Sequence, residues 1–205
     1  MTYEIFCNMC YNKYENTIDK RLINMNCNIK KRTIMIFPQF ENINIINEIR
    51  EKNDPLANHV RPHITLVFTF ESSITSIELK DHLEKVLEGT KRFRLTLQEI
   101  VKIDNPLGLY LFLDIKQGNE QIKKLNEKLY TGILQTYKPH WLKVGTFMPH
   151  MTIGSFISKE DLNIAFKNTE RIKEDFSTIV DKISVEIIDE NEDSIIELEV
   201  DLNDE

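Results

Sequence analysis

The stretches Pro62-His63-Ile64-Thr65-Leu66 and Pro149-His150-Met151-Thr152-Ile153 repeat one pattern of residue types at two places in the 205-residue chain. In each copy a histidine follows a proline, and the histidine and threonine alternate with apolar residues. Successive side chains of a β-strand point to opposite faces, so each copy predicts a strand with an imidazole and a hydroxyl on one face and apolar side chains on the other. The repeat therefore predicts a duplicated fold.

The sequence around the first copy predicts strands and helices in alternation. Gly89 is a residue that readily ends a helix. The expected elements are a strand at 33–37 ended by Pro38, a short helix with Ile43, Ile46, Ile49 and Leu56 inward, the motif strand at 63–70, a helix at 77–87 before Gly89, and a strand at 93–103.

The second half of the sequence predicts the same order of elements. It contains a strand at 109–115, a helix at 120–134 with Ile122, Leu125, Leu129 and Ile133 inward, the motif strand at 150–156, a helix at 159–167, and strands at 178–188 and 194–202. We therefore expect an α+β fold of two lobes related by a pseudo-twofold axis, with two mainly antiparallel sheets facing a central cleft and helices on their outer faces.

The charge of the chain argues against binding along a nucleic-acid duplex. The net charge is −7, but the segment 189–205 holds nine acidic and no basic residues, which leaves 26 basic and 24 acidic side chains in the rest. Binding along a duplex depends on many Lys and Arg contacts to phosphates. A small or terminal anionic ligand fits this balance better than a long duplex.

The N-terminal part of the sequence predicts little about function. We expect an extension of unknown role at 1–31, followed by one bilobal domain at 32–205. Cys7, Cys10 and Cys27 form neither an even disulfide set nor a four-ligand zinc pattern, so free thiols are expected. The sequence shows neither a signal peptide nor an apolar run long enough to cross a membrane, which predicts a cytoplasmic protein. No dimer surface is evident, so a monomer is expected.

The two His-Thr pairs point to acid-base chemistry on a phosphate. One imidazole can accept a proton from a nucleophile while a second, protonated one donates to a leaving oxygen. The hydroxyls of Thr65 and Thr152 can donate to oxygens on which charge develops. The usual H-E-x-x-H, Walker and G-x-S-x-G patterns are absent from the sequence. These features predict an enzyme that needs neither a metal nor another cofactor.

Other interpretations of the same residues remain open. Each histidine could simply be the first residue of a strand, although the repetition of the whole pattern argues against this. His63 and His150 could instead bind zinc together with a carboxylate or water. The chain could also be a non-catalytic module that binds a nucleotide or an RNA end.

The wording R-P-H-I-T-L-V-F at 61–68 and P-H-M-T-I-G-S-F at 149–156 resembles the 2H phosphoesterase superfamily, especially its bacterial 2′-5′ RNA ligase-like branch, over about 32–202. The resemblance implies a cofactor-free hydrolase that opens 2′,3′-cyclic phosphates to 2′-phosphates or cleaves 2′-5′ linkages in RNA or nucleotides. It implies catalytic roles for His63, Thr65, His150 and Thr152. We expect His150 to activate water and His63 to protonate the leaving 3′ oxygen.

Further residues near the motifs in the sequence are candidates for binding the substrate. A base requires an aromatic face and a phosphate requires cations. The candidates are Arg61, Tyr110, Trp141, Lys143 and Phe156.

Overall fold

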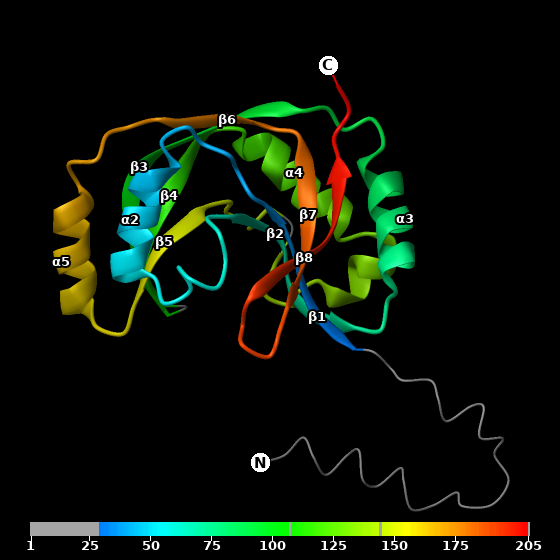
Figure 1. Cartoon of the computed structure of the whole chain (residues 1–205), viewed down its shortest axis with the longest axis horizontal. Coiled ribbons are helices and arrows are strands. Elements are labelled where there is room, and N and C mark those ends of the chain that lie inside the picture. The colour runs from blue at the N-terminus through cyan, green and yellow to red at the C-terminus, as the bar shows by residue number, and fades with distance from the viewer. Residues whose placement is uncertain (1–28, 107, 144, 205) are drawn as a thin grey trace, which may run out of the picture.

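The computed structural model describes residues 29–106, 108–143 and 145–204 (Figure 1). The expectations for the first 28 residues, including the three cysteines, lie outside this part. None of the described helices is long and apolar enough to cross a membrane. The elements are β1 (Lys30–Ile36), α2 (Ile43–Asn53), β2 (Ile64–Ser72), α3 (Ser76–Leu87), β3 (Phe93–Asn105), β4 (Gly108–Gln117), α4 (Asn119–Leu129), the 3-10 helix η1 (Gly132–Tyr137), β5 (Met151–Phe156), α5 (Lys159–Thr169), β6 (Phe176–Val180), β7 (Lys182–Ile188) and β8 (Ser194–Asp201).

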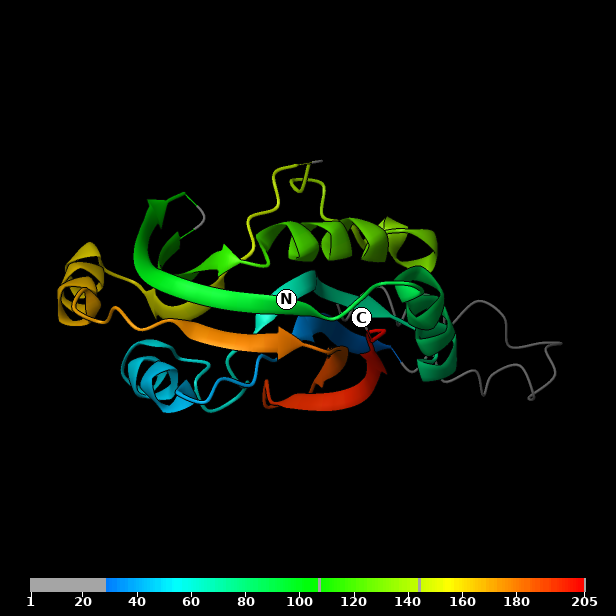
Figure 2. The same ribbon diagram turned by 90° about the horizontal axis from the view of Figure 1, so that it is seen from above.

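Two four-stranded antiparallel sheets form the fold, with strand orders β2-β1-β7-β8 and β5-β4-β3-β6. Helices α3 and α4 pack on the first sheet, whereas α2 and α5 pack on the second. The two sheets with their helices form the two sides of the molecule in Figure 1, and Figure 2 shows the same arrangement from above. The expected bilobal α+β fold is confirmed. The motif strands β2 and β5 are outer strands of their sheets, and they contact each other.

The lobes are not successive halves of the chain. Strand β3 belongs to the first half but pairs with β4 and β6, while β7 returns to pair with β1 and β8 pairs with β7. The expected single strand at 178–188 was wrong, because β6 ends at Val180 and β7 begins at Lys182 in the other sheet. One residue, Asp181, carries the chain between the sheets (Figure 1). The alternation changes phase at this point, because Asp181 and Lys182 are both exposed between the buried Val180 and Ile183, and the expectation of a single strand overlooked that break.

The prediction that Leu56 and Ile133 face the core from helices was also wrong. Helix α2 ends at Asn53, and Leu56 is 43% exposed. The next residue, Asp54, is extended and precedes a proline, which disfavours helical geometry. Helix α4 ends at Leu129, and Ile133 is 41% exposed. Gly132 lies between them with a φ of 53°, a left-handed conformation that a continuing α-helix does not contain.

Side chains at the first turn determine where two of the helices begin. In α3 the Thr75 hydroxyl accepts a hydrogen bond from the backbone N–H of Glu78, and the Glu78 carboxylate accepts one from the backbone N–H of Thr75. In α5 the Ser158 hydroxyl accepts a hydrogen bond from the Asp161 N–H. These caps satisfy backbone donors that have no partner within the helix. Both helices begin within one residue of the position expected from the sequence.

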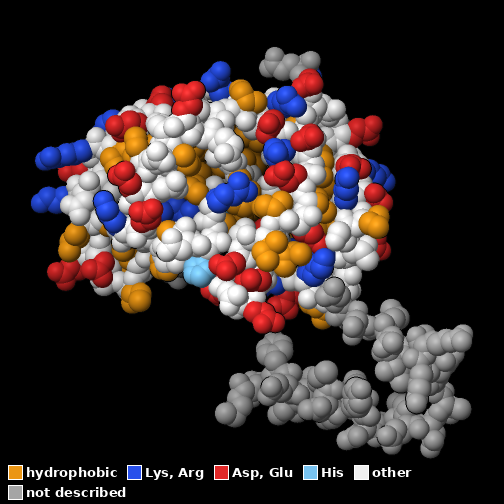
Figure 3. Space-filling view, in the orientation of Figure 1, with side chains coloured by type: hydrophobic (Ala, Val, Ile, Leu, Met, Phe, Trp, Pro, Cys, Tyr) orange, Lys and Arg blue, Asp and Glu red, His pale blue; other side chains and the backbone are white. Residues whose placement is uncertain are grey.

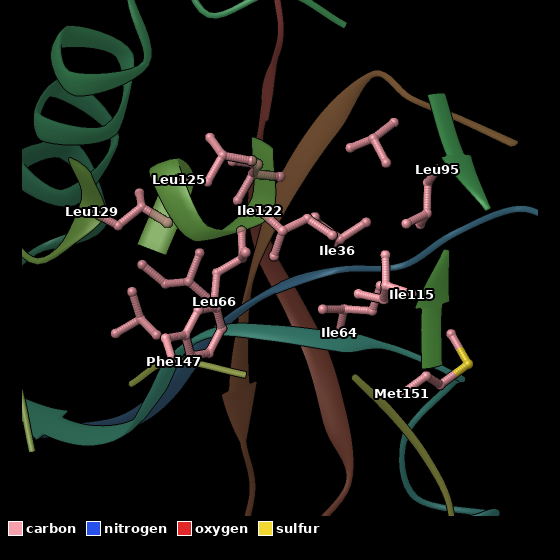
Figure 4. Packing of buried hydrophobic residues seen from close by; sticks show 14 of the residues in the cluster. Ile36, Ile64, Leu66, Leu95, Ile115, Ile122, Leu125, Leu129, Phe147 and Met151 are labelled. Carbon is pink, nitrogen blue, oxygen red and sulfur yellow. The ribbon is translucent and has the colours of Figure 1, made fainter. Parts of the chain in front are cut away.

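One hydrophobic core joins the two sheets. Figure 4 shows Leu66, Leu125 and Leu129 on one side of this core and Ile115 and Met151 on the other. The apolar motif residues contribute directly, since Ile64, Leu66, Met151 and Ile153 are all fully buried. Because their burial fixes one face of each motif strand, the threonines that alternate with them must lie on the opposite face.

A buried ion pair links β1 to β8. The guanidinium of Arg32 is fully buried and donates from Nε and Nη2 to the Glu197 carboxylate, at 2.6 and 2.9 Å, and from Nη1 to Ser72. Lys30 and Ser76 also donate to Glu197. Burial favours the neutral form of Glu197, but the hydrogen bonds from Arg32, Lys30 and Ser76 outweigh it and lower the pKa to about 2. The pair therefore holds an ionised carboxylate between the first strand, the last strand and α3.

Candidate active site

The two histidines occupy equivalent positions just before β2 and β5. His63 Nδ1 lies 2.8 Å from the carbonyl oxygen of Arg61, and His150 Nδ1 lies 2.8 Å from that of Met148, in each case two residues earlier. A carbonyl oxygen only accepts, so Nδ1 carries the hydrogen in both rings. Each imidazole therefore has Nε2 left for chemistry, in the same tautomer and with the same local support.

His63 and His150 are within electrostatic reach of each other. Burial lowers the pKa of His63 to about 4; the Arg61 carbonyl works against this, while Arg50 and His150 lower the pKa further. Burial also lowers the pKa of His150, although its hydrogen bond to the Met148 carbonyl works in the opposite direction. Both rings are therefore mainly neutral at pH 7 in the unliganded protein. A bound phosphate would supply the negative charge that favours protonation of one of them.

A buried arginine fixes the loop that leads to His63. Arg50 is 2% exposed; its Nε donates to Asp54 at 2.8 Å, its Nη1 to the Val60 carbonyl at 2.8 Å and its Nη2 to the Leu56 carbonyl at 3.3 Å. These bonds satisfy buried carbonyl groups along the segment between α2 and β2. The loop thus places His63 with little freedom.

The tip of the same loop is attached to the β7–β8 hairpin. His59 Nδ1 lies 2.8 Å from Asp193 Oδ1, and the backbone N–H of Ser194 donates to the His59 carbonyl at 2.9 Å. The contacts of His59 are those of a residue that joins two loops.

Aromatic rings from β4 cover His150. The Phe112 ring stacks on the imidazole with centroids 3.7 Å apart and planes 15° apart, and Tyr110 stacks on Phe112 at 5.5 Å. Pairing of Phe112 with Thr152 and of Tyr110 with Ser155 places these rings on the His-Thr face of β5. Tyr110 was a candidate from the sequence and Phe112 was not, although both alternate with buried residues in 109–115.

An aromatic ring, Phe37, and a cation, Arg61, lie beside His63. The Arg61 guanidinium carbon lies 4.4 Å from the centroid of the Phe37 ring, and Phe37 meets His63 edge to face at 6.2 Å. The cation–π contact holds an exposed arginine next to the imidazole. Arg61 is therefore positioned to meet an anion bound at His63.

The other residues predicted to bind substrate differ in how near they lie to the two histidines. Trp141 is 60% exposed and packs edge to face on Phe68 at 4.9 Å, and Phe68 lines a pocket with His63. Lys143 is exposed in the same loop as Trp141. Phe156 does not lie beside the histidines, because it pairs with Leu109 and packs against the core. Trp141 thus reaches the site through Phe68, whereas Phe156 lies on the other face of β5.

A pocket of about 260 Å³ opens beside the first His-Thr pair. It lies on the face of the first sheet that is opposite the core, under the loop before His63. Its lining consists of Lys31, Thr33, Met35, Leu56, Val60, His63, Thr65, Phe68, Thr69, Glu186, Ile188, Glu192 and Ser194.

The described surface carries charges of both signs (Figure 3) and no cluster of metal-binding side chains. On the face seen in Figure 3, Lys and Arg side chains are interspersed with Asp and Glu. Within residues 29–106, 108–143 and 145–204, no three His, Cys, Asp or Glu side chains are grouped so that they could hold a metal ion.

Known proteins resemble this chain in sequence and in fold. The family model described as the 2′-5′ RNA ligase superfamily matches residues 37–192. A Bacillus licheniformis protein named "putative phosphoesterase" is 26% identical over 133 residues, which cover 64% of this chain and 74% of that protein. A Halalkalibacterium halodurans protein with the same description is 26% identical over 154 residues, 74% of this chain and 85% of the relative. The crystal structure of Escherichia coli LigT complexed with 3′-AMP has a TM-score of 0.56 at 15% identity, covering 85% of this chain and 99% of that chain.

Proposed function

The chain belongs to the 2′-5′ RNA ligase superfamily of 2H phosphoesterases, and we propose that it is a metal-independent phosphodiesterase acting on nucleotides or RNA ends. Its substrates are 2′,3′-cyclic phosphates, opened to 2′-phosphates, or 2′-5′ phosphodiester linkages. The observation that supports this most is the matched pair of imidazoles, each with Nδ1 bound to a backbone carbonyl two residues earlier and Nε2 left for proton transfer. Crystal structures of LigT with 3′-AMP, ATP and phosphate add that a protein of this fold holds such ligands.

In the proposed reaction the phosphate lies between the two histidines. One neutral imidazole takes a proton from water as the water oxygen bonds to phosphorus. The other, protonated, imidazole donates its proton to the 3′ oxygen as the bond between phosphorus and that oxygen breaks. The hydroxyls of Thr65 and Thr152, each on the same strand face as its histidine, donate to the non-bridging oxygens. Protons and charge balance without any other group.

The order of the two roles follows from which imidazole is more easily protonated when substrate is bound. We assign water activation to His150 and protonation of the 3′ oxygen to His63. Asp114 works against this order, because its carboxylate raises the pKa of His150 and so favours the cation there. Asp54 favours the assigned order, because its carboxylate raises the pKa of His63, although Arg50 lowers that pKa.

Side chains around the histidines supply binding groups for the rest of the nucleotide. Arg61 lies beside His63 and is placed to contact a phosphate oxygen. Tyr110 continues the stack that begins with Phe112 on His150 and offers a face to a base. Trp141, mostly exposed above Phe68, offers a second aromatic face.

The function is tested by incubating the protein with 2′,3′-cyclic nucleoside monophosphates and with a 2′-5′-linked dinucleotide, all in excess chelator. Formation of a 2′-phosphate or of two nucleotide fragments is expected, and the His63→Ala/His150→Ala double variant serves as the blank. Tight binding of the nucleotides without any product would instead support a non-catalytic nucleotide-binding module. Activity that disappears in chelator and returns with zinc would support the metal-site interpretation.

The pH dependence of kcat/KM is expected to be bell-shaped with its maximum below pH 6.5. The profile reports the free enzyme, in which both histidine pKa values lie below the ordinary 6.5 and that of His63 lies at about 4. The rate rises as the base loses its proton and falls as the acid loses its own, so the maximum lies between the two values. Initial rates from pH 4 to 9 at constant ionic strength measure it. A rate that rises steadily through neutrality would contradict the two-histidine scheme.

A further inference from the structure

A buried carboxylate lies in the pocket beside His63 and takes no part in the proposed reaction. Glu186, on β7, is 2% exposed and pairs across the sheet with Thr33, on the face opposite the core. Its Oε2 accepts a hydrogen bond from the Ser194 hydroxyl. The Thr33 hydroxyl also bonds to its carboxylate, and it lies 3.0 Å from the Thr69 hydroxyl. These four side chains form one connected hydrogen-bond network, called here the Glu186 network.

The directions of the bonds in this network follow from the donors present. A carboxylate only accepts, so the single hydroxyl protons of Ser194 and Thr33 are both directed to Glu186. Thr69 must then donate its own proton to the oxygen of Thr33. Because every hydroxyl proton of the network is already used, the lone pairs of Ser194 and Thr69 are what the network offers to a ligand. This part of the pocket therefore accepts hydrogen bonds and does not donate them.

The remainder of the pocket suits a flat ring. Met35, Leu56, Val60, Phe68 and Ile188 supply apolar walls, and the polar side chains of the lining outside the network are Lys31, His63, Thr65 and Glu192. Apolar walls with a few fixed polar groups are the usual construction of a site for a heterocycle. Since a nucleobase is joined to its phosphate through one ribose, a phosphate held at His63 leaves the base within reach of this pocket.

We propose that the pocket beside His63 holds the base of the nucleotide that carries the scissile phosphate, and that the Glu186 network selects bases with an amino group over uracil. Adenine, cytosine and guanine each present an NH₂ group, whereas uracil presents carbonyl oxygens at O2 and O4. Uracil has one base donor, N3–H, flanked by these two oxygens, so wherever that N–H donates a carbonyl oxygen also lies beside the acceptors of Ser194, Thr69 and Glu186, and such mismatches of buried polar groups are costly. The inference names the substrate class of the proposed phosphodiesterase and rests on that function.

The preference is measured as kcat/KM for the four nucleoside 2′,3′-cyclic monophosphates. We expect the uridine compound to be at least about tenfold poorer than the best of the other three, which corresponds to one lost polar contact. In Glu186→Gln the amide can present its NH₂ group to a uracil carbonyl. The difference between bases should then shrink to about threefold or less, chiefly through a gain for uridine.

Two further variants separate base selection from structural damage. Glu190→Gln makes the same chemical change at an exposed position of the same hairpin, outside the pocket lining, and should keep the wild-type preference. Thr69→Val removes an acceptor at an exposed position without touching the buried carboxylate, and should narrow the preference as Glu186→Gln does. Thermal melting of each variant shows whether it is folded, and a neutral amide is less costly to bury than a carboxylate.

Binding of the four nucleoside 2′-monophosphates, measured by calorimetry, distinguishes failure of this inference from failure of the proposed function. Selective binding of the amino-bearing bases without turnover of any substrate would support the pocket and overturn the phosphodiesterase. Turnover of all four cyclic nucleotides with equal kcat/KM would overturn the pocket and leave the enzyme. A preference that survives unchanged in both Glu186→Gln and Thr69→Val, or no binding of any base, would also overturn the assignment.

Discussion

Replacing either His63 or His150 by alanine is expected to lower kcat by about 10³-fold, because each imidazole performs one of two proton transfers and such a transfer contributes ~10²–10⁴-fold. The double variant should be little slower than either single variant, since residues that act as a unit have non-additive effects. The measurement is the initial rate on the preferred 2′,3′-cyclic nucleotide, in chelator, at the optimal pH of the wild type. Product affinity should change much less than kcat, because Arg61 and the aromatic rings remain.

The matched control is His140→Ala. His140 is exposed in the loop before the second motif, so this variant makes the same histidine-to-alanine change outside the site. Its rate should equal that of the wild type. If His63→Ala or His150→Ala kept a tenth of the wild-type rate, the paired acid-base mechanism would be refuted.

The same two variants reveal the order of roles. A substrate with a p-nitrophenyl leaving group needs no proton on the departing oxygen, so the variant that lacks the general acid should be largely restored on it. The variant that lacks the general base should remain slow. Restoration of His63→Ala supports the assigned order, and restoration of His150→Ala supports the order that Asp114 favours.

Replacing Glu197 by alanine is expected to lower the free energy of unfolding by about 3–5 kcal/mol, since it leaves the fully buried guanidinium of Arg32 without its carboxylate. Urea unfolding at pH 7 measures the loss. Glu199→Ala is the matched control, because its ion pair with Lys182 is 39% and 44% exposed and such pairs are worth at most ~1 kcal/mol. A loss at Glu197 no larger than that at Glu199 would show that the buried pair contributes little.

The stability at acid pH should also report the interaction between Glu197 and Arg32. The folded pKa of Glu197, about 2, lies below its ordinary value of 4.5, so the contribution of this carboxylate to stability is complete above pH 4.5. It is lost as the pH falls from 4.5 through 2. In Glu197→Gln this part of the acid dependence should be missing.

The motif strands could be predicted from the sequence because alternation is a local property. Ile64 and Met151 had to be buried if the strands formed, and their burial turns the threonines the other way. The helix starts at α3 and α5 are equally local, since each cap lies within four residues. What could not be predicted was the partner of each strand, because the break in alternation at Asp181 and Lys182 marks a strand end but does not indicate that β7 joins β1, about 150 residues earlier.

The surroundings of the site depended on contacts between distant segments. Phe112 stacks on His150 only because β4 pairs with β5 in the observed register. Glu186 lies in a run of alternating apolar and polar residues at 182–188, and no neighbouring residue in the sequence indicates that Thr33 lies beside it in the fold. The aromatic alternation in 109–115 was a usable signal for Phe112, whereas Glu186 offered none.

The exchange of strands between the lobes has a consequence for how the chain reaches its native state. β3 pairs within the second sheet, which has all its strands once β6 has been synthesised, whereas the first sheet begins with β1 and β2 and is complete only when β7 and β8 have followed. The pairing of β1 with β7 joins residues about 150 positions apart, and such high contact order slows folding. A nascent chain that ends before β7 leaves one edge of β1 open, a surface on which other chains can aggregate. The sheet that carries the His63 strand is therefore completed only after all four strands of the sheet that carries the His150 strand have been synthesised.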